Sequence, residues 1–157
     1  MPSKRLELTT NIDAPIELVW AHMTNVSKYA TWNPFVIEAQ SDGDTNRPGT
    51  VLSFRVKWHD GGYANSQERV SHVQPVHKVS GGAQEAEWWY SFHSVFTRIG
   101  MIKTLRKQSL RQAQGQATLY SNEFVMTGWG SGVAPWDKIE LGMKAQAQAM
   151  KAISEQN

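Results

Sequence analysis

The segment that most constrains the fold of this chain is 14–35, which reads APIELVWAHMTNVSKYATWNPF. Pro15 suits the first turn of a helix, because its missing N–H would have no partner there in any case. Asp13 is then expected to be the N-cap, and apolar side chains recur at helical spacing until Asn25 ends the helix. A second short helical segment, 26–31, leads into Trp-Asn-Pro-Phe, where the residue before the proline must be extended. Two short helices followed by a strand are therefore predicted.

Alternation of apolar and polar side chains predicts strands on both sides of this segment. Strands are expected at residues 6–12, 35–40, 52–58, 64–76, 85–92, 105–113 and 117–127. Within 64–76, Val70 and Val73 fall out of phase, and a β-bulge would reconcile them. The segment 94–104 is apolar in parts but is interrupted by Gly100. No regular element is assigned to it, and a loop over the mouth of a cavity would fit.

The segment from Pro135 to about Ser154 is predicted to be the longest helix. Its apolar side chains step by three or four residues: Trp136, Ile139, Met143, Ala147, Met150 and Ile153. Gly142 lies within it, where glycine costs roughly 1 kcal/mol relative to alanine and therefore indicates close packing or space beside the helix. Two early helices, a run of strands and one late helix make an α+β order, and residues 1–157 are expected to form a single domain.

Composition narrows the classes of function. The chain has 157 residues, no cysteine and a formal net charge of +2. Disulfides and thiolate metal sites are excluded, and the five histidines show no metal-ligand spacing, so no metal and no cofactor are expected. The small net charge does not call for nucleic acid as a partner. No signal-like segment and no run of ~20 apolar residues is found, which predicts a cytoplasmic protein without stable membrane insertion.

The basic residues are unevenly distributed. No acid occurs between Glu87 and Glu123, an interval that holds Arg98, Lys103, Arg106, Lys107 and Arg111. Two interpretations are open. These side chains could simply be solvated on strands and loops, or they could face an anionic partner such as a lipid head group or an acidic ligand, with weak contact to anionic surfaces.

The early segment also carries a known pattern. It reads I-x-A-P-x-x-x-V-W, then an aromatic residue, then W-N-P-F, in Ile12, Ala14, Pro15, Val19, Trp20, Tyr29 and Trp32 to Phe35. Later, Glu123-Phe124 to Gly128 is similar to a second pattern, E-x-F-x-x-x-G, and a long helix follows. The chain thereby resembles the SRPBCC superfamily, the helix-grip domains that include START, Bet v 1-like and polyketide cyclase/dehydrase-type proteins.

The resemblance implies a helix-grip α+β fold. A curved antiparallel sheet of about six to seven strands would wrap around the long C-terminal helix, with two short helices after the first strand. The gap between sheet and helix would be a pocket. Inward-facing aromatic residues could then line a cavity as well as fill a core.

The expected cavity lining follows from that geometry and the strand alternation. It comprises Leu52, Phe54, Val56, Trp58, Trp88, Tyr90, Phe92, Tyr120, Asn122, Phe124, Ile139, Met143 and Met150. The polar candidates on inward faces are Thr10, Tyr90, Tyr120 and Asn122. Glu123 is expected on the outer face as a salt-bridge partner. No catalytic residue is assigned, because no spacing supports a nucleophile, base and acid together.

Three functions remain open. The first is binding of a hydrophobic or amphipathic small molecule of the lipid, polyketide, isoprenoid or quinone class. The second is an enzyme of the polyketide cyclase or dehydrase kind, in which one or two groups move protons. The third is a protein-interaction module that uses the basic stretch 98–111. Gly128, Gly130 and Gly132 are expected to form a flexible gate or a close-packed turn before the last helix.

Overall fold

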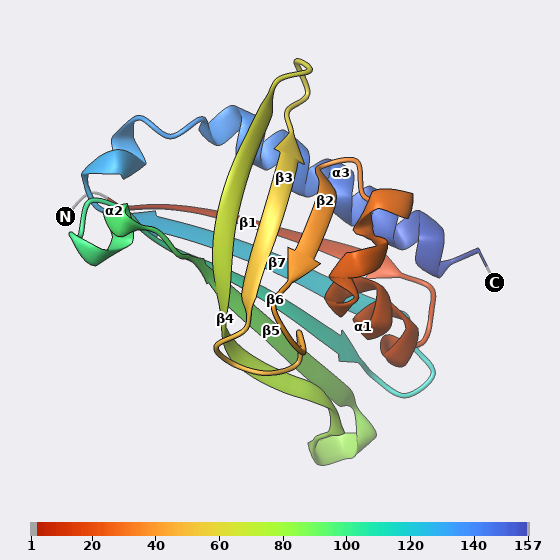
Figure 1. Ribbon diagram of the computed structural model, residues 1–157. Helices are drawn as coiled ribbons and strands as arrows, with labels where there is room; N and C mark the ends of the chain where they lie inside the picture. Colours follow the sequence, from red (N-terminus) through yellow and green to blue (C-terminus); the bar gives the residue numbers. More distant parts are fainter. Residues whose placement is uncertain (1–2, 157) are drawn as a thin grey trace.

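The computed structural model describes residues 3–156 and contains one seven-stranded antiparallel sheet with the order β1-β7-β6-β5-β4-β3-β2 (Figure 1). The strands are β1 (Ser3–Ile12), β2 (Val36–Ser41), β3 (Val51–Lys57), β4 (Tyr63–Lys78), β5 (Gln84–Phe92), β6 (Lys103–Gln112) and β7 (Thr118–Thr127). The helices are α1 (Ile16–Thr24), α2 (Val95–Arg98) and α3 (Trp136–Ser154), with 3-10 turns η1 (Val26–Thr31), η2 (Ser80–Gly82) and η3 (Trp129–Gly132). This is the helix-grip α+β fold expected from the sequence.

The sheet is strongly bent. In Figure 1, β2, β3 and β4 cross steeply in front of β1, β7 and β6, and α3 runs behind β3 and β4. The long strand β4 makes this bend possible, because its pairing with β5 shifts between Val70 and His72 and again between Gln74 and His77. Such bulges bend a strand and increase its twist. The bulge predicted from the phase of Val70 and Val73 is confirmed.

The corner between η1 and β2 is fixed by Asn33. This residue is 4% exposed, and its Oδ1 accepts hydrogen bonds from the N–H groups of Phe35 and Val36, both at 2.9 Å. Tyr29 anchors the preceding turn, since its hydroxyl donates to the carbonyl of Met23. The chain therefore leaves helix where the sequence predicts, through an amide side chain that replaces the missing backbone partners.

The start of α1 differs from the expectation. Pro15, and not Asp13, is the N-cap, and no side chain caps the helix. The N–H of Asp13 instead donates to Glu155 Oε2 at 2.7 Å, beyond the end of α3. Proline provides the extended backbone that begins the helix, while Asp13 links the first helix to the last.

Gly142 of α3 marks a very close contact. A Cβ at this position would lie 2.2 Å from ring carbons of Phe35, which is 5% exposed. The glycine thus permits close packing between the helix and the corner before β2. Gly128 and Gly130 likewise press against residues 101 and 102, so this part of the glycine run before α3 is a close-packed turn, while Gly132 has open space beside it.

Residues 95–98 form one turn of helix, α2, where no element was assigned from the sequence. Ser94 is its N-cap and accepts from the N–H of Phe96 at 3.1 Å, while Thr97 Oγ1 accepts from the N–H of Ser94 at 3.1 Å. This reciprocal arrangement is a capping box. The helix has only four residues, too few for a helical period to show in the sequence, which is why periodicity alone did not find it.

Candidate functional site

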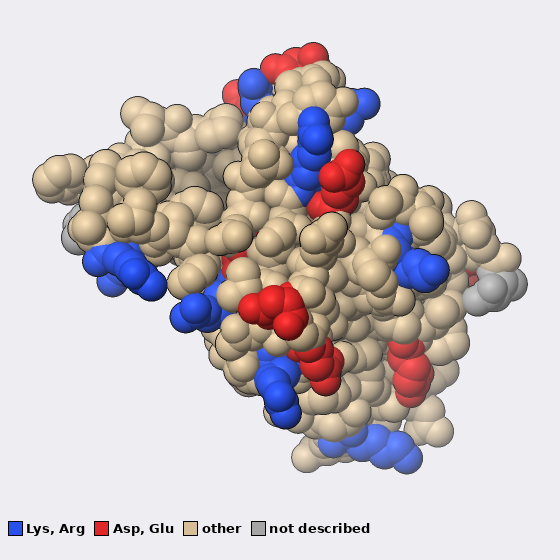
Figure 2. Space-filling view, in the orientation of Figure 1, with Lys and Arg blue, Asp and Glu red and all other residues tan. Residues whose placement is uncertain are grey.

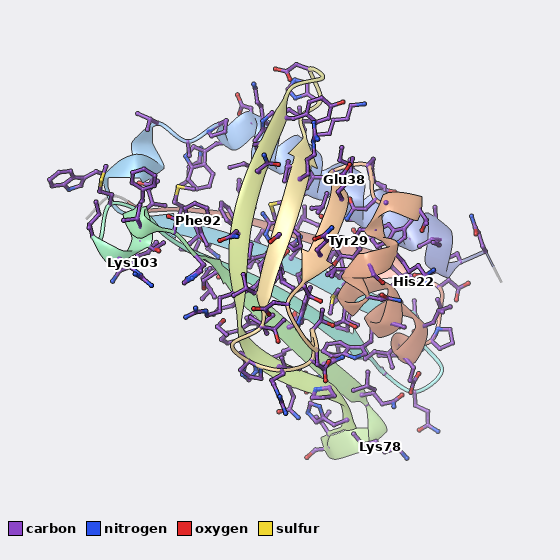
Figure 3. The ribbon with its side chains drawn as sticks, in the orientation of Figure 1. His22, Tyr29, Glu38, Lys78, Phe92 and Lys103 are labelled. Atoms are coloured by element: carbon purple, nitrogen blue, oxygen red, sulfur yellow. The ribbon has the colours of Figure 1, made fainter. Side chains whose placement is uncertain are left out.

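A cavity of about 240 Å³ lies between the bent sheet and α3. Inward-facing residues of β3 to β7 form most of its wall, and Ile139 of α3 contributes to it. Phe92, at the end of β5, marks the side nearest α2 (Figure 3). The wall is mostly aromatic and aliphatic, which favours an apolar ligand.

Part of the expected lining is at this cavity. Seven of the thirteen residues lie in its wall: Phe54, Val56, Trp58, Tyr90, Phe92, Phe124 and Ile139. The other six lie outside the wall, each at 0% exposure: Leu52, Trp88, Tyr120, Asn122, Met143 and Met150. These six belong to the packed interior, because the sheet and α3 close on each other before the cavity reaches them.

Two charged residues lie in the wall, and neither was among the lining residues expected from the sequence. Glu68 reaches it from β4 and Arg106 from β6. Arg106 is only 9% exposed, and its guanidinium lies 4.9 Å from the ring centroid of Phe124. Ser66 Oγ donates to Glu68 Oε1 at 3.4 Å. A mostly apolar cavity thus contains one carboxyl and one guanidinium.

Burial controls the protonation of this carboxyl. Loss of hydration raises the pKa of Glu68 to about 7, although the charge of Arg106 and the hydrogen bond from Ser66 act in the opposite direction. Burial likewise raises the pKa of Tyr90 to about 12, so its hydroxyl stays protonated. At neutral pH, Glu68 is therefore divided between its neutral and charged forms.

A buried hydrogen-bond network lies behind Tyr90. Gln108 Nε2 donates to the Tyr90 hydroxyl at 3.2 Å, the Tyr120 hydroxyl donates to Gln108 Oε1 at 2.5 Å, and Asn122 Nδ2 donates to the Tyr120 hydroxyl at 3.0 Å. Burial raises the pKa of Tyr120 well above its ordinary value. The network fixes Tyr90 at the cavity wall. Thr10, the remaining polar candidate, is half-buried on β1 opposite Tyr120 and lies outside the cavity wall.

The basic interval does not form one solvated surface. Arg106 points into the cavity, whereas Lys107 lies on the other face, 4.5 Å from the ring centroid of Trp89. Arg111 forms an ion pair with Glu85 at 3.0 Å. The interpretation of these side chains as simply solvated is therefore wrong for Arg106, which is 9% exposed and lies in the cavity wall. A protein-interaction role for 98–111 stays a prediction that can involve only its exposed members.

Glu123 occupies the outer face, as predicted. Its Oε2 lies 3.3 Å from Nη2 of Arg5 on the neighbouring strand. Within residues 3–156, no group of three or more histidine or acidic side chains is arranged to hold a metal ion. None of the helices in that range is both long and apolar enough to cross a membrane.

Solved structures share this fold over nearly the whole chain. The di-domain ARO/CYC BexL from the BE-7585A biosynthetic pathway gives a TM-score of 0.72 at 14% identity over 99% of this chain, which spans 51% of that protein, about half its length. Major latex-like protein 151 from Panax ginseng gives 0.72 at 9% identity over 98% of both chains. Protein NE0264 from Nitrosomonas europaea gives 0.66 at 13% identity over 97% of this chain and 94% of that one. At these identities the likeness establishes the fold alone.

Comparison of the sequence with protein families identifies a family, beyond the fold, from part of the chain. No curated protein sequence matches it significantly. Residues 3–93, more than half of the chain, match the family described as polyketide cyclase / dehydrase and lipid transport. That match covers the early helices, the corner at Asn33 and the first five strands, which include Glu68 and most of the cavity wall. The chain therefore belongs to the polyketide cyclase/dehydrase and lipid transport family of the SRPBCC superfamily.

Proposed function

We propose that this protein binds a hydrophobic or amphipathic small molecule in the cavity between the sheet and α3. The observation that supports this most directly is the wall itself, in which Phe54, Trp58, Phe92 and Phe124 surround space not filled by side chains. Transfer of apolar ligand surface out of water contributes roughly 25 cal/mol per Å². A ligand of this kind needs few polar contacts to bind.

Filling the cavity tests this function. Ala64 lies in the wall on β4, so Ala64→Phe should place a ring in the cavity while the fold is retained. Binding of a fluorescent naphthalene-sulfonate dye is measured together with the melting temperature. The wild type should bind the dye and Ala64→Phe should not, whereas Ala152→Phe, at an exposed position of α3, should bind normally. A folded Ala64→Phe protein with unchanged dye binding would place the ligand elsewhere.

A second candidate, a cyclase or dehydrase reaction, is favoured by the presence of Glu68 beside a cationic group in the same wall. Charged Glu68 would remove a proton from carbon next to a substrate carbonyl, and the C–H electron pair would form an enolate stabilised by Arg106. The enolate carbon would then attack a second carbonyl carbon. The resulting alkoxide would take the proton back from Glu68, and loss of that hydroxyl with a neighbouring hydrogen would release water.

Heptane-2,4,6-trione is a suitable probe for this reaction, since its cyclisation with loss of one water gives a dihydroxytoluene that absorbs in the ultraviolet. The wild type should accelerate ring formation. Glu68→Gln should abolish the acceleration while dye binding persists. If the wild type binds the dye but leaves the trione unchanged, the binding function stands and the reaction is excluded for this substrate.

A further inference from the structure

The charged residues lie at the deep end of the cavity. Along β4 the wall residues are Ala64, Ser66 and Glu68, and the next inward residue, Val70, is 1% exposed. Along β6 the wall contains Arg106, and the next inward residue, Gln108, is 0% exposed. Both charges are therefore the last groups that a ligand meets before the packed core.

Arg106 has hydrogen-bonding capacity that the described residues do not use. Within residues 3–156 its guanidinium takes part in no ion pair. It lies over the ring of Phe124, and its charge acts on Glu68 across the cavity wall. Buried guanidinium groups normally pair with a carboxylate or another oxyanion, because desolvated donors without partners are costly. Glu68 does not fully supply this partner, because its carboxyl is partly protonated, and so partly uncharged, near neutral pH. A ligand oxyanion is the partner that this end of the cavity lacks.

We propose that the ligand of this cavity is an amphipathic monocarboxylate, whose carboxylate binds Arg106 at the deep end and whose apolar body lies along Trp58 and Phe124. The inference rests on the proposed binding function and names its ligand class. A carboxylate matches the planar donors of a guanidinium. One negative charge can be accommodated because Glu68 takes up a proton when the ligand binds, whereas a dianionic phosphate would bring a further charge that no cavity residue neutralises.

The groups that determine this proton uptake are few. Of the side chains that line the cavity from β2 to β7 and from α3, only Glu68, Tyr90 and Arg106 are charged or titratable. Tyr90 stays neutral because its pKa is raised to about 12. A bound carboxylate next to Glu68 further disfavours the charged form of that residue. Binding should therefore weaken as the pH rises above about 7.

The test compares decanoate with 1-decanol, which has the same chain length and no charge. Dissociation constants are measured by displacement of the naphthalene-sulfonate dye at pH 6. The wild type should bind decanoate at least about tenfold more tightly than decanol. Arg106→Gln should remove this preference and leave decanol binding intact, while Arg106→Lys should keep part of it. Arg111→Gln, an exposed position on the same strand, is the matched control and should behave as the wild type.

The pH dependence is a separate readout. For the wild type, the dissociation constant of decanoate should be flat below pH 6 and should rise by about tenfold per unit above pH 7. Glu68→Gln should bind decanoate with little change across this range, and decanol binding should not depend on pH. If the wild type prefers decanol, or if folded Arg106→Gln keeps its preference for decanoate, the monocarboxylate proposal is overturned. If neither compound nor the dye binds the wild type, the binding function itself fails.

A different observation concerns the surface beside the cavity. Two neighbouring segments, 95–101 and 129–133, are called here the apolar tip. They expose Val95, Phe96, Ile99, Met101, Trp129 and Val133, of which Trp129 is 77% and Val133 87% exposed. The N–H of Gly130 donates to the carbonyl of Met101 at 3.2 Å, which joins the two segments. An exposed apolar cluster of this kind marks an interaction surface.

The charges around the apolar tip are mainly basic. Arg98 and Lys103 are exposed at its edge, and Asp137 is the nearest acid in the chain. In Figure 2 this end of the molecule is mostly uncharged, with basic side chains along its lower edge, where Figure 3 labels Lys103. Exposed tryptophan and aliphatic side chains next to basic ones are typical of segments at the surface of an anionic bilayer. Ile102, which directly follows the tip, lines the cavity.

We infer that the apolar tip docks on an anionic lipid bilayer, which would bring the cavity next to a source of amphipathic ligand. The test is sedimentation with vesicles of phosphatidylcholine alone or with about 30% phosphatidylglycerol. The wild type should sediment with the anionic vesicles and its tryptophan emission should shift to shorter wavelength. The double variant Ile99→Ser with Trp129→Ser should remain in the supernatant. Arg98→Gln with Lys103→Gln should lose the preference for anionic vesicles.

Leu119→Ser is the control, because Leu119 is an exposed apolar residue on β7 away from the tip, and this variant should bind as the wild type. Sedimentation velocity in the absence of lipid addresses a second copy of the chain as the alternative occupant. Docking on a bilayer is excluded if the wild type ignores anionic vesicles. It is also excluded if the tip instead forms a dimer that the double serine variant dissociates.

Discussion

Glu68 carries a stability cost that depends on pH. In the folded protein its pKa is raised to about 7, mainly by burial, while an unfolded chain releases this proton at the ordinary value of 4.5. Between these two values the folded state holds more protons than the unfolded state. The free energy of unfolding should therefore fall as the pH rises from about 4.5 through 7, and the change from this group should be complete by about pH 8.

Replacement of this residue makes the effect measurable. Glu68→Gln has no carboxyl to ionise, so the variant should gain stability relative to the wild type as the pH rises from 5 to 8. The expected gain is about 2–3 kcal/mol, from the size of the pKa shift. Urea unfolding at several pH values gives the difference. A difference that stays constant with pH would mean that the carboxyl is well hydrated.

For the substitution Gly142→Ala, packing and helix propensity have opposite effects on stability. Alanine in a helix is favoured over glycine by roughly 1 kcal/mol, but a Cβ here would lie 2.2 Å from the ring of Phe35. We expect Gly142→Ala to lower the free energy of unfolding by about 1–3 kcal/mol, because overpacking outweighs propensity. Gly132→Ala is the control, since nothing lies within 4 Å of its Cβ position. Increased stability of Gly142→Ala would contradict the tight contact.

Asn33 replaces two backbone partners at the corner. Asn33→Ala leaves the N–H groups of Phe35 and Val36 without the side-chain acceptor, and each buried unsatisfied donor costs about 1–3 kcal/mol. Urea unfolding should show a loss of about 2 kcal/mol or more. Asn46→Ala, at an exposed loop position, should change stability by less than about 0.5 kcal/mol. Equal effects of the two substitutions would show that water replaces the amide.

At the scale of elements, the two ends of the fold are joined by Glu155. Its Oε2 accepts from Lys151 Nζ at 2.7 Å and from the N–H of Asp13 at 2.7 Å, and Lys151 Nζ also donates to the carbonyl of Asn11 at 2.8 Å. These bonds connect the C-terminal end of α3 with the end of β1 and with the residue that follows it. They hold the end of the helix against the chain that leads into α1.

The same carboxylate gives a pH dependence of the opposite sign to that of Glu68. The hydrogen bonds from Lys151 and Asp13 lower the pKa of Glu155 below its ordinary value of 4.5. Its contribution is present above pH 4.5 and is lost as the pH falls through the lowered pKa. The melting temperature of Glu155→Gln should lie below that of the wild type at pH 7 and approach it near pH 3. A gap that persists at pH 3 would assign the effect to packing.

Long elements were predictable because their periodicity is sustained. The strand with Leu52, Phe54 and Val56 alternates without interruption, and the helix from residue 136 steps regularly to its end. The N-cap of α1 was not predictable, because Asp13 and Pro15 are both residue types that occur at the start of a helix. Only the contact of Asp13 with Glu155, which comes from the tertiary structure, distinguishes the two. Short α2 has too few residues for a period to show.

The candidate site was harder to predict, since its wall depends on how far the sheet closes on α3. Trp88 and Phe92 share a face of β5, yet only Phe92 reaches the cavity. Glu68 could have been found by counting back from Val70 in steps of two, because the bulge begins only after that residue. Arg106 offered no such signal, as Leu105 and Leu110 suggest opposite phases for β6.

At the scale of the molecule, the sheet is open at both edges. β1 and β2 each pair with a single neighbour, and β1 pairs only with β7, from Ser3 opposite Thr127 to Ile12 opposite Thr118. The strand that begins the described chain is thus completed by the last strand of the sheet. The remaining strands pair with neighbours in sequence, through β2 to β7.

This pairing sets an order for synthesis on the ribosome. Strands β2 to β6 can form their hairpins as they emerge, because each partner follows closely in the chain. β1 is synthesised before the other strands, but it cannot pair with β7 until residue 127 has left the exit tunnel. α3 cannot close over the sheet before then either. During that interval β1 has no strand partner, because it pairs only with β7, and its apolar residues stay exposed. Exposed apolar residues of this kind are what chaperones recognise on a nascent chain and where aggregation begins.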